Sequence, residues 1–420
     1  MTTTPPPPSP PPTFTGYQKL VVGMLAFLQF AVILDFMLMA PLGALIMPAL
    51  SVDPRQFGLI VSGYAFSAGA AGLLTAGFAD RFDRKKLLLF FYGGFVLGTA
   101  WCGLATSFES LLAARIVTGL FGGVIGSVVL AISADLFPPS MRGRVMGIIQ
   151  TAFAASQVLG IPVGLYLSNH WNWQVPFLAM AALGAVGGLV VAWKMKPVAD
   201  HLKQPQSRSP WVHLRHTLTE PRYLVAFATT ALVATGGFML MPFSSAFAVN
   251  NLGIGMHSLP TVYLITGLCT IGFGPLIGRA ADAVGKFKVF AAGTAVTLVM
   301  VLLYTHLGPI SLPMLVLVNA VMFVGIFSRV IPFQAMVAGI PTMAQRGAFT
   351  AISASIQQLS GGIASVVAGH IVVQGADGRL QHFDVVGYVV VAASLVALGL
   401  VWLLQKTPAA PAAQEVRAVP

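Results

Sequence analysis

The stretch ADRFDRKKLLLFF, residues 79–91, places a string of charged side chains directly before an apolar run. A related stretch, GRAADAVGKFK at residues 278–288, also lies between apolar runs. Asp80 and Asp282 are 202 positions apart, and Arg84 and Lys286 repeat that spacing. A constant offset between two basic loops in a hydrophobic chain indicates a duplicated membrane protein, with halves related by an axis along the membrane normal.

The composition of the 420 residues also indicates a membrane protein, since 56% are hydrophobic and only 8% are charged. Apolar runs recur at roughly the 20 residues that a helix needs to cross a bilayer. Backbone polar groups in hydrocarbon must be bonded internally, and these runs lack the alternation of barrel strands. The predicted fold is therefore an all-α polytopic membrane protein.

Twelve apolar runs are expected to form transmembrane helices in two pseudo-symmetric six-helix bundles. The polar stretch 195–221 separates them as a cytoplasmic linker between an N-terminal bundle at 19–194 and a C-terminal bundle at 222–405. Disordered tails rich in Pro or Ala are expected at 1–18 and 406–420. The runs lie near 19–48, 55–79, 86–106, 109–133, 145–168, 174–194, 222–246, 258–281, 288–306, 311–333, 347–372 and 385–405.

The distribution of basic residues predicts the orientation. Most of the 23 Lys and Arg residues fall on one side of the spans, and cytoplasmic loops carry the excess of such residues. Both termini are therefore expected in the cytoplasm, with the chain in a cell membrane of the bacterial inner-membrane type. The net charge of +11 follows from this topology, so no nucleic-acid partner is expected.

Three local patterns support one family. They are Asp80, Arg81, Arg84 and Lys85 in the first basic loop, Arg115 and Gly119 in the fourth run, and Gly160, Pro162 and Gly164 in the fifth. Together they resemble the major facilitator superfamily, within its proton-coupled drug and sugar efflux branch. The resemblance covers the chain outside its tails, although Ala76 and Asp83 replace two glycines of the family's loop pattern.

The resemblance implies a conformational latch in the basic loops. A carboxylate at Asp80 suits the positive end of a helix dipole, and in the family that helix is the eleventh, which starts here near Arg346. Such a contact exists only while the cytoplasmic side is closed. The alternative is that the basic residues only keep the loop in the cytoplasm. The latch residues are Asp80, Arg81, Arg84, Lys85, Asp282 and Lys286.

Ionisable residues inside the spans are the next candidates, because a charge in hydrocarbon costs about 2.5–3.5 kcal/mol on insertion scales. Asp35 and Arg115 both lie in the outer half of the membrane, and in the family their helices line one central cavity. We expect Asp35 to exchange a proton and substrate while Arg115 tunes its charge. The alternative is a fixed structural ion pair. Arg329, near the end of the tenth run, is expected to extend to the interface, or else to contact substrate or a gate.

Glycines in the fifth run predict close helix packing. Gly160 and Gly164 share a face, and Pro162 between them removes a backbone hydrogen bond and bends the helix. We expect this face and Gly119 to serve in packing or as a hinge, with Gly361, Gly362 and Gly369 of the eleventh run as the matching surface. In the family, the pattern of the fifth helix is associated with efflux.

Amide side chains are the candidate substrate contacts. Gln150 and Gln157 are seven residues apart and share a helix face, and Gln357 lies on the eleventh helix, which borders the cavity in the family. Amide groups suit sugars, nucleosides and amphiphilic drugs alike. The sequence contains no phosphate-binding glycine loop, no zinc-type Cys/His spacing and no nucleophile elbow, so no cofactor, metal or enzymatic activity is expected.

The predicted function is export of a small organic substrate, such as a drug or sugar, in exchange for protons by alternating access. The expected partners are the substrate, protons and the lipid bilayer, and a monomer suffices for this fold. A symporter or uptake facilitator of the same fold is the main alternative. A membrane sensor without transport is a remote one, because no signalling domain is attached.

Overall fold

The computed structural model describes residues 13–75, 79–203, 217–341 and 345–406. Within these residues, twelve helices are long and apolar enough to cross a membrane, which confirms the predicted all-α polytopic fold. The two predicted tails lie largely outside the described residues. The first helix begins at Gly16, however, so residues 16–18 are helical and do not belong to a tail.

Each half of the chain supplies six of the twelve spans. The elements of the first half are α1 Gly16–Leu38, α2 Gly43–Leu50, α3 Pro54–Thr75, η1 Ala79–Arg81, α4 Arg84–Leu104, α5 Phe108–Leu136, α6 Pro139–Ala155, η2 Ser156–Gly160, α7 Ile161–His170, α8 Val175–Lys194 and η3 Asp200–Lys203. Those of the second half are α10 Pro221–Asn250, η4 Met256–Ser258, α11 Leu259–Val284, α12 Lys286–Thr305, α13 Leu312–Val337, α14 Arg346–Ile371, β1 Val373–Gln374, β2 Leu380–Gln381 and α15 Phe383–Lys406.

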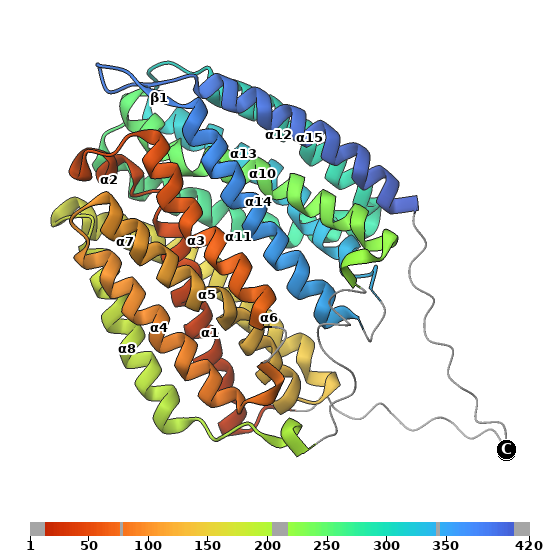
Figure 1. Cartoon of the computed structure of the whole chain (residues 1–420). Helices are drawn as coiled ribbons and strands as arrows, with labels where there is room; N and C mark the ends of the chain where they lie inside the picture. The colour runs from red at the N-terminus through yellow and green to blue at the C-terminus, as the bar shows by residue number, and fades with distance from the viewer. Residues whose placement is uncertain (1–12, 76–78, 204–216, 342–344, 407–420) are drawn as a thin grey trace.

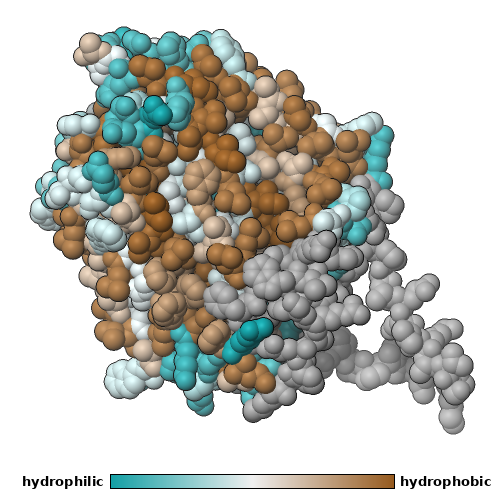
Figure 2. Space-filling model, viewed as in Figure 1, coloured by the Kyte–Doolittle hydropathy of each residue, from teal (hydrophilic) through white to brown (hydrophobic). Residues whose placement is uncertain are grey.

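The helices run between two ends of the molecule (Figure 1). We call them the linker end, where α8 ends and α10 begins, and the hairpin end, where β1 and β2 pair. The first half, red to yellow, packs beside the second half, green to blue. Hydrophobic side chains dominate the middle of the face in Figure 2, and hydrophilic ones gather toward its ends, as a lipid-embedded surface requires.

Several helices begin where the sequence supplies a cap. Thr15 accepts a hydrogen bond from the Gln18 amide, and the Gln18 side chain accepts one from the Thr15 amide, which forms a capping box at the start of α1. Asp83 accepts a hydrogen bond from the Lys86 amide and caps α4. Its φ is −55°, so aspartate is unstrained at the position where the family pattern has glycine.

The prediction of one helix over 19–48 is wrong. α1 ends at Leu38, and the separate helix α2 starts at Gly43. Pro41, between them, has no amide hydrogen and disfavours a helical conformation in the residue before it. Gly43 then packs so closely that an added Cβ would lie 2.9 Å from the Phe57 ring.

The fifth span contains an irregular turn. It runs from α6 through the π-helical segment η2 into α7, where Pro162 occupies one of the first two positions. Pro162 has no amide hydrogen to donate to the carbonyl one turn earlier, and π-helical turns interrupt the regular bonding of α-helices. The predicted irregularity in this helix therefore lies just before Pro162.

The glycines of this span pack within the first half. An added Cβ at Gly160 would lie 2.5 Å from the Leu34 side chain, and one at Gly164 would lie 2.6 Å from Leu38. Both glycines therefore bring the fifth span against α1. The expectation that this face matches the glycines of α14 is wrong, because the fifth span and α14 pack against different helices. The nearest side chains and backbone to Gly361, Gly362 and Gly369 are Phe238, Phe66 and Pro54 respectively.

The two halves meet along α3 and α14. An added Cβ at Gly58 would lie 2.7 Å from the Ser365 carbonyl oxygen, and one at Gly69 would lie 2.8 Å from Leu359. These contacts extend from the hairpin end toward the middle of both helices. Small residues therefore allow the backbones of two helices from opposite halves to approach closely.

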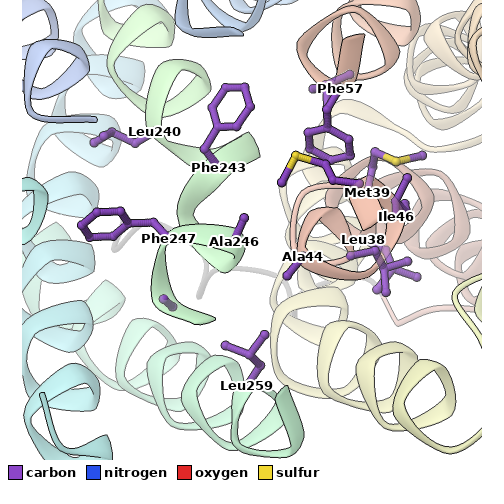
Figure 3. Packing of buried hydrophobic residues seen from close by; sticks show 14 of the residues in the cluster. Leu38, Met39, Ala44, Ile46, Phe57, Leu240, Phe243, Ala246, Phe247 and Leu259 are labelled. Carbon is purple, nitrogen blue, oxygen red and sulfur yellow. The ribbon is translucent and has the colours of Figure 1, made fainter. Parts of the chain in front are cut away.

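A second contact closes the hairpin end with apolar side chains. Figure 3 shows side chains from α1 and α2 facing those of α10. The rings of Phe57 and Phe243 lie edge to face with centroids 6.2 Å apart. Few directional bonds cross this contact; among the described residues, Ser245 donates to the Ala40 carbonyl at 2.9 Å, and the Asn169 side chain donates to the Met256 carbonyl at 3.1 Å.

Candidate functional site

Asp35 and Arg115 form a buried ion pair inside the first half. Asp35 lies in the last turn of α1, and Arg115 lies two turns into α5. Arg115 Nη1 donates to Asp35 Oδ2 at 2.7 Å, and their side chains are 1% and 0% exposed. The two helices therefore place the predicted pair at one depth, toward the hairpin end.

Two neighbouring helices complete the environment of this pair. Thr99 on α4 donates a hydrogen bond to Asp35 Oδ1 at 3.1 Å. The Arg115 guanidinium carbon lies 4.5 Å from the centre of the Tyr64 ring on α3, a cation–π contact. Sequence reasoning missed both residues, since Thr99 and Tyr64 are neutral. Their signal was a polar group within an apolar run.

Aromatic rings connect the ion pair to the second half. The ring of Phe36 lies 5.2 Å from that of Tyr64 and 5.6 Å from that of Phe238, centroid to centroid. Phe238 belongs to α10 and packs in turn against Gly361 of α14. These contacts therefore form a continuous chain from α14 and α10 to the ring that covers Arg115.

A cavity of about 500 Å³ lies between the halves, nearer the linker end. Two predicted residues, Gln150 and Gln157, lie in its wall on the first half, whereas Gln357 on α14 is exposed and does not line it. Its walls are mostly apolar with a few amide and hydroxyl groups, as is usual for sites of small organic molecules. The lining comprises Gly147, Gln150, Thr151, Phe153, Ala154, Gln157, Gly267, Thr270, Ile271, Gly274, Pro275, Phe327 and Ile331.

The ion pair does not line this cavity. Asp35 has no exposed surface, and the cavity wall is built from α6, η2, α11 and α13 rather than α1 and α5. The structure thus separates two groups that the sequence assigned to one site.

The first basic loop binds within its own half. Arg84 is buried, and its Nε donates to Asp135 Oδ2 at 3.2 Å. Lys85 Nζ donates to the Ala192 carbonyl at 2.8 Å, whereas Arg81 is exposed. The side chain of Asp80 lies outside the described residues, so the latch remains a prediction.

The second basic loop follows the glycine pattern. Gly285 has φ +106°, a conformation that glycine adopts without the strain of a side chain. Lys286 donates to the Ala335 carbonyl at 3.3 Å, near the end of α13, and Asp282 is exposed. Side chains of both basic loops therefore form hydrogen bonds with helix ends of their own half.

The structure corrects the expectation for Arg329. The Arg329 side chain is 4% exposed, so the prediction that it extends to the membrane interface is wrong.

Gly119 packs closely against α3. An added Cβ at Gly119 would lie 2.3 Å from the Tyr64 carbonyl oxygen. The glycine thus lets α5 approach the part of α3 that presents the Tyr64 ring to Arg115.

Comparison with known proteins gives relatives of several kinds. The chain is 27% identical to the uncharacterized MFS-type transporter YceJ of Bacillus subtilis (strain 168), over 85% of this chain and 89% of that protein. It is 36% identical to the vacuolar membrane amino acid uptake transporter fnx2 of Schizosaccharomyces pombe, over 35% of this chain and 26% of fnx2. It is 31% identical to the multidrug resistance protein fnx1 of that yeast, over 33% of this chain and 26% of fnx1.

A solved structure shares the fold. It is the bacterial homolog of the human lysosomal transporter Spinster, in an inward-facing and unoccupied conformation, with a TM-score of 0.75 and 16% sequence identity. The match covers 95% of this chain and all of that one. The model of the Major Facilitator Superfamily matches residues 25–330 and 226–419. This chain therefore belongs to the Major Facilitator Superfamily of membrane transporters.

Proposed function

We propose that the protein exports a small organic substrate in exchange for protons, with Asp35 as the proton-binding group and Arg115 as its counter-charge. The observation that carries this proposal is the 2.7 Å ion pair, fully buried in a transporter of two bundles. A buried acid inside a membrane transporter is a functional candidate with a named partner.

The chemistry follows from the charges. While Arg115 contacts Asp35, the carboxylate is neutralised and needs no proton. If a change in the packing of the halves withdraws the guanidinium, the carboxylate is left uncompensated in a medium of low dielectric constant, and binding a proton removes that cost. The contact of Phe36 with Phe238 supplies a path by which the second half moves Tyr64, and with it Arg115.

The cavity is the proposed substrate site. Gln150 and Gln157 offer amide donors and acceptors on one wall, and Phe153 and Phe327 approach each other across it with centroids 6.3 Å apart. The halves are in contact at the hairpin end while the cavity lies toward the linker end. Alternating access then consists of opening the hairpin end as the linker end closes, with the basic loops and Asp80 as the latch.

The direction and orientation of transport complete the proposal. The positive-inside distribution of Lys and Arg supports an orientation with the linker end and both termini in the cytoplasm of a bacterial cell. Export is supported by the resemblance of Gly160, Pro162 and Gly164 to the efflux pattern and by the name of the multidrug resistance protein fnx1. The chain is proposed to act as a monomer.

The test is proton flux in proteoliposomes that contain the purified protein and a pH dye. Cationic drugs, sugars and nucleosides are added in turn, and tracer measurements follow the substrate itself. In the wild type, we expect the substrate to trigger proton movement in the direction opposite to its own. In Asp35→Asn, we expect no substrate-triggered proton movement. Asp53→Asn is the matched control, because Asp53 is exposed and acts only as a helix cap. Normal coupling in Asp35→Asn would overturn the proposal.

Uptake is the second candidate. It is favoured by the 36% identity to fnx2, whose name describes amino acid uptake. The same vesicles distinguish the two functions once amino acids are added to the panel. Substrate and protons that move in the same direction indicate a symporter, and substrate movement without proton movement indicates a facilitator.

A further inference from the structure

Arg329 is buried inside the second half and forms no ion pair with the described residues. Its side chain is 4% exposed, and its Nε and Nη2 have no hydrogen-bond partner among them. The guanidinium carbon lies 5.8 Å from the centre of the Phe290 ring, a contact that leaves both nitrogens without a hydrogen-bond acceptor. The site is separate from the Asp35–Arg115 pair, which lies in the first half.

The acidic residues that the structure describes in the second half lie at helix ends or outside helices. They are Glu220 before α10, Asp282 in the last turn of α11, Asp377 in the hairpin and Asp384 in the first turn of α15. A buried cation without an acid or other partner carries a large desolvation cost. The contrast with Arg115, which has a carboxylate at 2.7 Å, indicates that the described residues do not supply a partner for Arg329.

Ser394 on α15 supplies a second unused polar group. Its Oγ is buried and has no partner within the described residues. Several other buried hydroxyls in this half donate to the carbonyl four residues earlier, as Thr294 does to Phe290 at 2.8 Å and Thr297 does to Gly293 at 2.7 Å. The hydroxyl of Ser394 makes no such bond and is available to a ligand.

Both groups converge on Gly236 of α10. A Cβ built on Gly236 would lie 3.9 Å from Arg329 Nη1, 3.9 Å from Ser394 Oγ and 3.6 Å from the Val390 side chain. These are ordinary contact distances, so an atom fits at this point without displacing its neighbours. The absence of a side chain at Gly236 thus leaves room next to two hydrogen-bond donors.

We propose that Arg329, Ser394 and Gly236 form a binding site for a small inorganic anion of chloride size. The anion neutralises the guanidinium and accepts hydrogen bonds from it and from the Ser394 hydroxyl. Because Arg329 is buried, we expect the anion to be small. Phe327 and Ile331 of the same helix line the substrate cavity, whereas Arg329, two residues from each, points to a different face.

Thermal unfolding of the purified full-length protein in detergent tests this site. The unfolding temperature is measured in sodium chloride and in sodium gluconate at equal ionic strength. A ligand that binds only the folded state raises the unfolding temperature with its concentration. We expect chloride to stabilise the wild type in a saturable manner, and bromide to replace it.

Single substitutions test whether the stabilising chloride binds at this site. Arg329→Gln is expected to abolish the chloride dependence, and Ser394→Ala to raise the half-saturating chloride concentration about tenfold, since one hydrogen bond to a charged group is lost. Gly236→Ala places a methyl group where the two donors converge and is expected to weaken chloride binding. Arg81→Gln, which changes an exposed arginine of the first half, is the charge-matched control and should keep the full dependence.

Several results would overturn the proposal. Equal unfolding temperatures in chloride and gluconate for the wild type would do so, as would an unchanged chloride dependence in both Ser394→Ala and Gly236→Ala. These two variants also decide the matter if Arg329→Gln does not fold. Stabilisation by acetate or lactate without any effect of chloride would replace the inorganic anion with an organic carboxylate.

Discussion

Phe36 and Phe238 come from opposite halves of the chain, and their rings lie 5.6 Å apart where the halves meet. Phe36 directly follows the buried Asp35 and also contacts Tyr64, the ring beneath the Arg115 guanidinium. A single side chain thus joins the interface between the halves to the ion pair. The proposed substrate cavity lies elsewhere, so this aromatic contact is the proposed mechanical connection between substrate and proton.

Replacement of Phe36 by leucine tests that connection. The variant keeps apolar volume but removes the aromatic ring, and aromatic pairs contribute about 0.5–1.5 kcal/mol beyond their buried area. We expect the number of protons moved per substrate to fall by a factor of about 2 to 10. Phe90→Leu, on the exposed face of α4, should leave the ratio unchanged. A normal ratio of protons to substrate in Phe36→Leu would show that Phe36 does not couple the two movements.

Thr99→Val is expected to destabilise the protein by about 1–3 kcal/mol, because Asp35 Oδ1 stays buried and loses the hydrogen bond that the Thr99 hydroxyl donates to it. Thr99→Ser keeps the hydroxyl and should restore most of the stability. Reversible unfolding in mixed micelles measures the difference. Equal stability of the valine and serine variants would show that the hydroxyl does not support the carboxylate.

Gly119→Ala should lower the yield and unfolding temperature of the protein. Its added methyl group would lie 2.2 Å from Ser67 Oγ and 2.3 Å from the Tyr64 carbonyl, so α3 and α5 must separate. Gly93→Ala is the matched control on α4, where an added Cβ meets nothing within 4 Å. This control should be neutral or slightly stabilising, since alanine favours helix more than glycine does. Equal behaviour of the two variants would contradict the close packing.

Gln157→Ala is expected to weaken substrate binding about tenfold, the effect of one lost hydrogen bond of about 1.4 kcal/mol. Gln150→Ala should act in the same direction. Gln357→Ala provides the control, because this residue is exposed and does not line the cavity. Half-saturating substrate concentrations in proteoliposomes supply the measurement. Weakening by Gln357→Ala alone would move the substrate site from the cavity to α14.

Arg84→Gln is expected to lower the unfolding temperature, because the buried guanidinium bonds both Asp135 and the Ala79 carbonyl. Arg81→Gln, three residues earlier on an exposed side chain, should have little effect. Calorimetry on the purified variants measures both. If the two variants unfold at the same temperature, the position of Arg84 within the loop has no special structural role.

The sequence predicted the fold well because membrane insertion depends on local properties. A run of about 20 apolar residues specifies a spanning helix wherever it occurs. The same criterion failed at Pro41 and Gly43, which are apolar by composition yet separate α1 from α2. Hydrophobic length detects a span, whereas backbone chemistry decides where a helix ends.

The site was predictable only where charge was present. Asp35 and Arg115 stood out as ionisable residues at the same depth, and the structure brings them together. Thr99 and Tyr64 carry no charge, and their signal, a polar group within an apolar run, is shared by other residues of the same runs, such as Ser62 and Tyr92. The pairing of Gly160 with α14 failed for a different reason: the spacing of glycines identifies a face for close contact but does not identify which helix meets it.

The apolar contact at the hairpin end has a thermal consequence. Phe57, Phe243 and their neighbours bury hydrocarbon with few directional bonds, so opening this end mainly exposes apolar surface to water. Such exposure increases the heat capacity, and the enthalpy of the step then changes with temperature. If opening limits turnover, the logarithm of the transport rate will follow a curve against inverse temperature, and larger side chains at this contact will make the curvature stronger.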